Sequence, residues 1–481
     1  MRALLCGTSA VALLSSFALS GAAQAAAAPD ATDVQAVIVT GTRTTGVKAA
    51  DSAAPIELVG KEALTHTGSV DLANALAASV PSLNVQAGGG DTAALTVQAA
   101  LRGLNPNDTL VLINGKRRHS TANLSVDGGS SYSGSATVDL SYIPVSAIDH
   151  IEVLQDGAAA QYGSDAIAGV VNIILKSSDH GGAVSATAGQ YYQGDGQTGA
   201  WSVNRGFTLG EKGFINFSVE QRTHDNSVLG IGGRSYSTPD GLPLPGPKLS
   251  GTPAIAAQMA AGVLASGPHF NKVNGDPTYN IVSGMLNAGY DLGSVQLYAF
   301  GSYGQRTASH YENYRGAQKA AGPNLNGVLT FALPNGFDPS EQFKETDFSG
   351  TVGAKGILAG WTWDLATTYG ENRDDVNTIN SANDELWKTL QAASATFVNP
   401  QRNFYDGSFI NREATTTLDI DREFNVGLAS PLNVAFGVEG RRDSFQILSG
   451  EPSSYYGAGA QSFIGYTPLD QGTHNRTNYA L

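Results

Sequence analysis

The chain has 481 residues and a formal net charge of −14, and 41% of its residues are hydrophobic against 15% that are charged. This length allows two or three domains, and the mixture is too apolar for a disordered chain and, with 58 glycines, too glycine-rich for a helical bundle. The acidic balance also argues against nucleic acid as a partner, because binding it needs a basic face and the longest basic run is Lys116-Arg117-Arg118.

Residues 1–25 have the features of a secretory signal peptide. Arg2 precedes a largely apolar stretch, and Ala23-Gln24-Ala25 is a small-x-small site, so we expect cleavage before Ala26. The single cysteine, Cys6, would be removed with this segment, leaving a mature chain without disulfides. No run of roughly 18 apolar residues follows, which excludes a helical membrane protein but allows a β-barrel, whose strands give weaker signals.

Residues 26–50 are small and polar and are predicted to be flexible. One β-prone patch interrupts them and consists of Val37, Ile38, Val39, Thr40 and Gly41. Such a patch inside a flexible segment can add a strand to the sheet edge of a partner. It can equally be the first strand of the next domain, and its chemistry leaves both interpretations open.

Residues 51–180 are predicted to form a compact α/β domain. Ser69 can cap a helix whose apolar face carries Leu72, Ala75 and Leu76. Asn114-Gly115, directly after an apolar strand at 110–113, is the strongest short hairpin signal in the chain. Further strands are predicted at 55–59, 151–154 and 169–176, and the last is expected to be buried on both faces because its apolar run is continuous.

From residue 181 onward the pattern changes to long segments that alternate between apolar and polar residues. The segments 214–222 and 432–443 show this alternation best, and it suits a strand between lipid and a wet interior. A soluble β-sandwich alternates in the same way, but runs of about a dozen residues exceed its usual strand length. We expect about ten strands and the start of another at 475–481.

The connections between these segments are alternately short and long. Short ones are predicted at 209–213 and 429–431, and long ones at 226–278, 314–340 and 374–411. Two long loops are expected to carry helices, near 254–266 and near 383–393. Short turns on one side and long loops on the other are typical of an outer-membrane barrel.

Motifs between residues 37 and 173 resemble those of TonB-dependent outer-membrane receptors. The patch at 37–41 is similar to a TonB box, the segments 101–104 and 109–117 to the central plug signature, and the segments 143–144, 151–154 and 162–173 to the closing plug signature. The residues that carry the plug resemblance are Arg102, Gly103, Asn114, Gly115, Arg117, Glu152, Asp156, Gly157, Tyr162, Gly163, Gly169 and Asn172.

The resemblance implies a mainly β fold, with an α/β plug domain inside a transmembrane antiparallel barrel of 22 strands, about half of them present here. It divides the chain into a signal peptide (1–25), a flexible segment with the TonB box (26–50), a plug domain (51–180) and a partial barrel (181–481). It implies export to the outer membrane of a Gram-negative bacterium, insertion into its lipid by the barrel-assembly machinery, and TonB with its inner-membrane energising complex as the partner. Ligand would bind outside, and TonB would pair with the TonB box and pull the plug aside.

Neither a catalytic site, nor a metal site, nor a cofactor is expected. Charged plug residues are predicted to bond to the barrel wall, or else to be solvated: Arg102, Asp108, Arg117, Glu152 and Asp156. Loop aromatics are predicted either to face the ligand or to belong to the interfacial girdle: Tyr191, Tyr192, Tyr455 and Tyr456, with Tyr311 and Tyr314. A ferric siderophore is the expected ligand, although cobalamin, haem and carbohydrate receptors share the architecture.

Other classes of protein were weighed against this interpretation. An enzyme is disfavoured because the G-x-G-x-x-G match at 194–199 joins two predicted strands instead of opening a helix, and we interpret it as a flexible hairpin. A passive porin would lack the plug signatures. Because the last residues, 478–481, lack the terminal aromatic typical of these barrels, we expect a truncated chain. A truncated chain could be a non-functional receptor, or a soluble periplasmic plug module that binds ligand, and both are kept as alternatives.

Overall fold

The computed structural model describes residues 55–87, 95–124, 132, 134–157, 162–227, 253–266, 275–428 and 431–481. The expected signal peptide and the expected TonB box at 37–41 lie outside the described residues. Every element below belongs to one compact unit, residues 37–481. Within the described part of the chain, no helix is both long enough and apolar enough to cross a bilayer.

The plug, by which we mean the described residues between 55 and 175, is built on a five-stranded sheet with the order β1-β6-β7-β4-β5. The strands are β1 Ile56–Gly60, β4 Thr109–Ile113, β5 Lys116–Arg117, β6 Ile148–Leu154 and β7 Gly169–Leu175. β4 and β7 are parallel and the other pairs are antiparallel. The plug also has a separate pair of strands, β2 Leu83–Ala87 and β3 Val97–Leu101. Two helices belong to it, α1 Lys61–His66 and α2 Leu72–Ser79. It contains four short 3₁₀ turns: η3 Pro106–Asp108, η4 Leu140–Tyr142, η5 Val145–Ala147 and η6 Ser164–Ala166.

Helix α2 buries the expected face, but its cap differs from the expectation. Leu72, Ala75 and Leu76 are buried as predicted. The prediction that Ser69 caps the helix was wrong, because Asp71 occupies that position and its Oδ1 accepts from the Asn74 backbone N–H at 3.1 Å. A capping side chain reaches only the amides two or three residues ahead, and the helix begins directly after Asp71.

Gly169, at the start of β7, is a position where only glycine fits. Its φ is +140°, and an added Cβ would lie 2.2 Å from the Leu154 carbonyl oxygen and 3.0 Å from Leu101 Cδ1. We therefore expect Gly169→Ala to destabilise the chain by about 3 kcal/mol, through overpacking and backbone strain together. Urea unfolding of the purified chain measures this. Gly189→Ala is the matched control, because nothing lies within 4 Å of its added Cβ, and an equal loss there would contradict the explanation.

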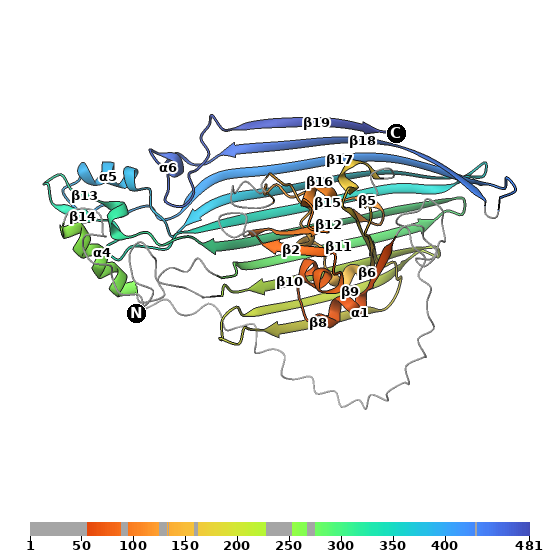
Figure 1. The fold of residues 1–481 in the computed structure, drawn as a ribbon, viewed down its shortest axis with the longest axis horizontal. Helices are drawn as coiled ribbons and strands as arrows, with labels where there is room; N and C mark the ends of the chain where they lie inside the picture. Colours follow the sequence, from red (N-terminus) through yellow and green to blue (C-terminus); the bar gives the residue numbers. More distant parts are fainter. Residues whose placement is uncertain are drawn as a thin grey trace, which may run out of the picture. The chain divides into compact units, whose positions relative to one another are not determined.

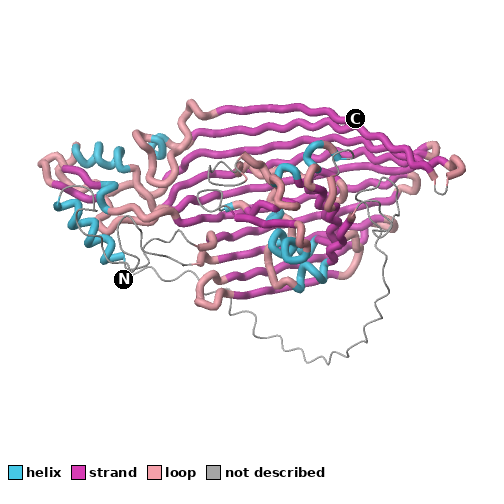
Figure 2. The backbone as a smooth tube through the Cα atoms, in the orientation of Figure 1, coloured by secondary structure: helices cyan, strands magenta, loops and turns pink. Residues whose placement is uncertain are grey.

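The second sheet has ten strands in the order β19-β18-β17-β16-β15-β12-β11-β10-β9-β8, all antiparallel (Figures 1 and 2). Its strands are β8 Gly182–Gly189, β9 Thr198–Leu209, β10 Gly213–His224, β11 Thr278–Asp291, β12 Val295–Tyr311, β15 Ser340–Leu358, β16 Trp361–Ile379, β17 Phe404–Phe424, β18 Leu432–Ser449 and β19 Gly472–Ala480. The strand expected to start at 475 is β19, and it is the tenth strand of this sheet, where the sequence predicted that it would follow about ten others. The segment at 194–199 joins β8 to β9 and opens no helix, as predicted.

The loops between these strands contain the two expected helices, α4 Pro253–Ser266 and α5 Asp384–Ala392. They also contain α6 Pro452–Tyr455, a 3₁₀ turn η8 Ala317–Ala320 and a small hairpin of β13 Ala321–Pro323 and β14 Leu329–Phe331. The long loop predicted at 374–411 is shorter than expected, because β16 continues to Ile379 and β17 begins at Phe404. The buried face of these strand ends mixes polar with apolar side chains, as in Asp374, Val376 and Thr378, which hides the alternation.

The two faces of the sheet differ in burial. On β15, Ser349 and Thr351 are buried, whereas Phe348 is 44% exposed and Val352 63% exposed. One face is thus polar and turned toward the plug, and the other presents apolar side chains. This is the alternation of a barrel wall, with lipid outside and a polar lumen inside.

Candidate functional site

A short segment after the β4–β5 turn, residues 116–122, contacts the sheet with almost every side chain. Lys116 Nζ lies 3.3 Å from Asp364 on β16 and 3.5 Å from Asp419 on β17. Ser120 accepts from Asn411 Nδ2 on β17 at 3.0 Å, with its Oγ and with its carbonyl. The segment therefore ties the plug to neighbouring strands of the wall.

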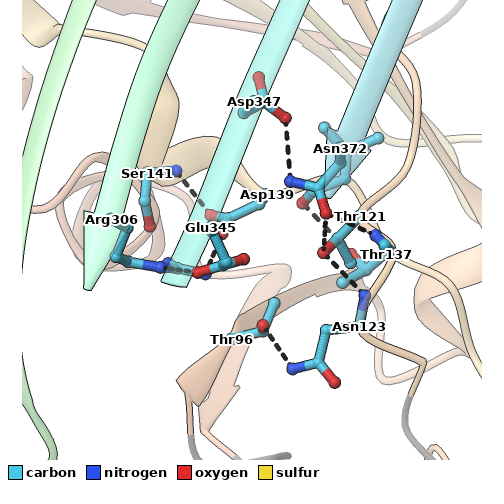
Figure 3. Close-up of polar contacts among 12 residues, drawn as sticks. Thr96, Thr121, Asn123, Thr137, Asp139, Ser141, Arg306, Glu345, Asp347 and Asn372 are labelled. Carbon is cyan, nitrogen blue, oxygen red and sulfur yellow. Dashed lines mark hydrogen bonds and ion pairs between the residues drawn. The ribbon is translucent and has the colours of Figure 1, made fainter. Parts of the chain in front are cut away.

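The centre of this segment forms a buried network around Asp347 on β15. Arg118 bonds to Asp347 and donates to Ser302 Oγ at 2.7 Å. His119 Nε2 lies 3.0 Å from the same carboxylate. Asn372 on β16 donates to Asp347 at 3.2 Å and accepts from the backbone N–H of Ala122 at 2.7 Å (Figure 3). Plug and wall thus share one continuous set of hydrogen bonds.

Burial lowers the pKa of His119 below its ordinary value of 6.5, and the charge of Arg118 lowers it further, against the raising effect of Asp347. The folded chain therefore holds this histidine neutral at a pH where the unfolded chain protonates it. Stability that depends on His119 is present above pH 6.5 and is lost as the pH falls below it. We expect His119→Asn to reduce the loss of thermal stability between pH 7.5 and 5.5. His66→Asn is the control, because the His66 side chain is exposed, and it should leave that pH dependence unchanged.

A second buried network surrounds Arg306 on β12. Its Nη2 lies 2.8 Å from Asp139 Oδ2 of the plug, and its Nε bonds to Glu345 on β15 (Figure 3). Asp139 also caps η4, where its Oδ1 accepts from the Ser141 backbone N–H at 2.8 Å. The guanidinium lies 5.4 Å from the centre of the Tyr142 ring, so it is held by charge and by an aromatic face together.

Arg222 on β10 makes a similar link to the beginning of helix α2. Its Nη1 lies 2.8 Å from Asp71 Oδ2, its Nη2 donates to the Ser141 carbonyl at 2.5 Å, and its Nε lies 3.1 Å from Glu220. The residue that caps α2 therefore also pairs with the wall. Breaking this pair would leave buried carboxylates without compensation.

Asp165 of the plug is shared by two arginines. Arg117 Nη1 and Arg441 Nη1, the latter on β18, each lie 2.7 Å from its Oδ2. Burial would raise the pKa of Asp165, but the hydrogen bond from Arg441 and the charge of Arg117 hold the pKa below its ordinary value. This carboxylate is therefore ionised and links the plug to a sixth strand of the wall, β18.

Four of the predicted plug residues form a network inside the plug. Asn172 accepts from the Gly115 backbone N–H at 2.9 Å and donates to Glu152 at 3.2 Å. Asn114 accepts from the Leu175 backbone N–H at 2.9 Å. Asn114 and Gly115 have φ angles of 48° and 77°, which the tight turn requires. These residues hold the β4–β5 turn, and with it residues 116–122, against β6 and β7.

The other predicted plug residues lie in turns around that sheet. Arg102 and Gly103 follow β3 with φ angles of 55° and 70°, and Arg102 donates to the Ile167 carbonyl at 3.2 Å. Five residues lie in or beside the segment that leads from β6 into β7: Asp156, Gly157, Tyr162, Gly163 and Gly169. Their positions indicate a role in shaping the plug.

The plug charges that meet the wall are mostly not the expected ones. Of the five that were predicted, Arg117 reaches it, 4.0 Å from Glu439 of β18, while Arg102 and Glu152 make the bonds described above within the plug. Sequence reasoning missed Asp71, Lys116, Arg118, His119 and Asp139. A basic run directly after a tight turn, in a chain that is otherwise acidic, was a signal for three of them.

Four of the predicted aromatics, Tyr191, Tyr192, Tyr455 and Tyr456, lie outside the ten long strands of the wall. Tyr191 bonds to Asp276, and Tyr192 beside it is fully exposed. Tyr455 ends α6 and Tyr456 follows it, the latter 42% exposed. Of the two other candidates, Tyr311 is the last residue of β12 and Tyr314 lies in the loop after it. Tyr314 is buried, and its hydroxyl donates to the Asn335 carbonyl at 2.7 Å.

A different aromatic cluster lies beside the plug. The Phe409 ring centre is 6.1 Å from that of Phe445 and 5.3 Å from that of Tyr466, and Phe463 lies 5.7 Å from Tyr466. Leu95 and Ala122 of the plug belong to the same apolar cluster. We call the four rings the lumenal aromatic cluster. Among the described residues, no group of three histidine, cysteine or acidic side chains is arranged to hold a metal ion.

Comparison with known proteins agrees with this geometry. Residues 48–170 match the family model of the TonB-dependent Receptor Plug Domain. Over 163 residues the chain is 34% identical to the vitamin B12 transporter BtuB of Vibrio vulnificus, a match that covers 34% of this chain and 24% of the relative. Over 79 residues it is 44% identical to the probable TonB-dependent siderophore receptor PirA of Acinetobacter baumannii, covering 16% of this chain and 10% of the relative.

A solved structure shows the same fold over most of the chain. A mutant of the ferric enterobactin receptor PfeA of Pseudomonas aeruginosa superposes with a TM-score of 0.56 at 15% identity, covering 87% of this chain and 54% of that one. The chain therefore spans about a quarter of the length of the first curated relative and about half of the solved receptor.

An α/β plug held by polar contacts against a wall of long antiparallel strands defines the class of plugged outer-membrane receptors. Residues 48–170 carry the plug domain of TonB-dependent receptors, and the described part of the chain adds ten strands of the wall, with the fold of the solved receptor. The relatives that it matches are transporters and receptors, not enzymes.

Proposed function

We propose that this chain serves in an outer-membrane receptor that takes up a scarce, large nutrient by energised displacement of the plug. In this proposal residues 51–180 form the plug, residues 181–481 belong to the barrel, and residues 37–41 pair with TonB. The chain would be exported by a cleaved signal peptide and inserted by the barrel-assembly machinery. The observation that carries the proposal is the polar contact between residues 116–122 and the wall.

Such a contact suits a plug that must move. Ion pairs and hydrogen bonds between plug and wall can be exchanged one by one for bonds to water as the lumen opens. An apolar interface of similar area would instead expose its surface to water without compensation. The plug core does touch Met285 and Phe300 of the wall, so part of the interface is apolar.

We propose a ferric siderophore as the ligand, bound at the lumenal aromatic cluster. Aromatic faces bind planar or apolar ligand groups. Burial and the charges of Asp470, Glu341 and Asp406 raise the pKa of Tyr466 to about 12, so carboxylates act on this site. Those charges oppose an anionic complex and favour a siderophore whose ferric form is neutral or positive, such as a hydroxamate. The names of PirA and PfeA support the siderophore class, and the name of BtuB supports cobalamin as its rival.

Uptake by cells tests the proposal. Cells with this gene and TonB are expected to accumulate radioactive iron from a ferric hydroxamate, and cells lacking either should not. Val39→Pro should reduce uptake to background, because proline removes a backbone donor that strand pairing with TonB needs. Uptake without TonB would indicate a passive channel, and uptake of cyanocobalamin alone would show that the siderophore assignment is wrong.

A further inference from the structure

The outward face of the sheet changes its chemistry along the strands. Three exposed aromatic residues on it each bond to a neighbouring polar side chain, Trp201 to Gln221, Tyr303 to Gln305, and Tyr369 to Glu371. We call these three the outer aromatic row. Rings with one apolar body and one bonded polar tip mark the boundary between lipid hydrocarbon and water. Trp201 lies near the loop end of β9, whereas Tyr303 and Tyr369 lie near the middle of β12 and β16. The long loops face outside in this family of folds, so the part of β16 beyond Tyr369 leads outward.

Beyond the outer aromatic row the outward face is polar and charged. On β16 the outward positions after Tyr369 are Glu371, Arg373, Asp375 and Asn377, which alternate with buried positions. Arg373 Nε lies 2.9 Å from Asp375 Oδ1, and Arg412 of β17 lies 2.7 Å from Glu371. Hydrocarbon cannot cover these groups without a large desolvation cost. The wall therefore continues above the membrane surface.

A groove of about 440 Å³ lies in this polar region, on the outward ends of β15, β16 and β17, within the size range of ligand sites. Six polar side chains line it: Gln342, Lys344, Asn377, Asn403, Tyr405 and Glu451. Gln342 stands opposite Asn377 in register, and Asn377 stands opposite Tyr405, so three strands contribute to one surface.

The floor of this groove is held in place, while part of its lining is free. The Tyr405 hydroxyl is 2.5 Å from Ser408 Oγ, and Glu451 accepts from Gln401 Nε2 at 2.7 Å. Among the described residues, no hydrogen bond or ion pair involves the side-chain amide of Gln342 or the ammonium of Lys344. A rigid floor with unused donors and an unused amide acceptor suits a ligand rich in hydroxyl groups.

The distance of the groove above the outer aromatic row decides which kind of lipid can reach it. Asn377 is eight positions beyond Tyr369 on β16, Trp361–Ile379, since 377 − 369 = 8. This corresponds to about 26 Å along the strand and about 20 Å in height at the usual barrel tilt. Phospholipid headgroups extend only about 5–8 Å beyond the hydrocarbon. A phospholipid therefore falls short, whereas a glycolipid with a saccharide chain reaches the groove.

We propose that this groove binds the saccharide chain of an outer-leaflet glycolipid. The inference rests on the proposed outer-membrane function, because it places the apolar band of the wall in the bilayer. The amides of Gln342 and Asn377 and the carboxylate of Glu451 bond to sugar hydroxyls, and the Tyr405 ring packs against a sugar face. Lys344 bonds to hydroxyl groups or to acidic substituents of the sugars. The contact anchors the receptor among surface sugars and leaves the lumen free for the transported ligand.

Binding of a lipid-free probe tests this proposal. The probe is the core oligosaccharide of lipopolysaccharide, released from its lipid by mild acid, titrated onto the chain purified from outer membranes in detergent. We expect saturable binding that weakens at least tenfold in Gln342→Ala/Asn377→Ala. Lys344→Gln should weaken binding several-fold. The Lys344 side chain is exposed and glutamine is also polar, so the thermal unfolding of the protein should stay the same.

The matched control is Gln221→Ala/Gln305→Ala, the same kind of change on the same face at the level of the outer aromatic row. This pair should bind the oligosaccharide as the unchanged protein does. An equal loss in the control pair, no binding of the oligosaccharide, or binding only of lipid A or of phosphatidylglycerol vesicles would overturn the proposal. Because the assay contains neither TonB nor the transported ligand, a negative result here leaves the uptake experiment to decide the proposed function separately.

Discussion

A disulfide between positions 120 and 411 is expected to reduce TonB-dependent uptake at least tenfold, and a reducing agent is expected to restore it. Ser120 belongs to the plug and Asn411 to β17, and Asn411 Nδ2 lies 3.0 Å from Ser120 Oγ. Thiols in Ser120→Cys/Asn411→Cys can therefore approach each other. The sequence has a single cysteine, Cys6, within the expected signal peptide, so no other thiol of the mature chain would compete. A covalent link would hold the plug on the wall.

The control places a disulfide within the wall. Thr351 on β15 and Thr368 on β16 are partners in register, with their Oγ1 atoms 2.8 Å apart. Thr351→Cys/Thr368→Cys joins two strands that stay together during transport, so oxidation should leave uptake unchanged. Normal uptake with a fully oxidised 120–411 pair would show that the plug does not leave β17 at this point, and the displacement mechanism would be wrong.

Arg306→Met is expected to destabilise the folded chain by about 3–5 kcal/mol. The substitution removes the cation that lies 2.8 Å from Asp139 and bonds to Glu345, both buried carboxylates. Asp374, also fully buried, interacts with Glu345 and would be affected as well. Methionine keeps much of the side-chain volume, so the loss reports on charge more than on a cavity. Urea unfolding in detergent, followed by tryptophan fluorescence, measures it.

Arg373→Met provides the comparison for this effect. Arg373 lies on the outward face, its side chain is 41% exposed, and its partner Asp375 is 34% exposed. Water already solvates this pair, so its loss should cost about 1 kcal/mol or less. Equal destabilisation by the two substitutions would mean that the burial of the Arg306 network does not determine its contribution.

Local signals in the sequence predicted a large part of the fold. The Asn114-Gly115 turn was predictable because positive φ angles favour these two residues whatever surrounds them. The helices in the loops and the alternating strands were predictable because burial on one face imposes a period on the residues themselves. Prediction failed where two neighbouring residues compete, as in the capping of α2 by Asp71 instead of Ser69. It also failed at the ends of β16 and β17, where the buried face mixes polar with apolar residues.

The sequence by itself therefore determined the class of fold, the plug motifs and the position of the turn before residues 116–122. Only the tertiary structure decided what those residues bind, because their partners are remote along the chain, as with Arg118 and Asp347, which are 229 positions apart. The same holds for the lumenal aromatic cluster, which combines two strands and a loop. Periodicity reports whether a side chain is buried, whereas the partner of a buried charge depends on the register and order of the strands.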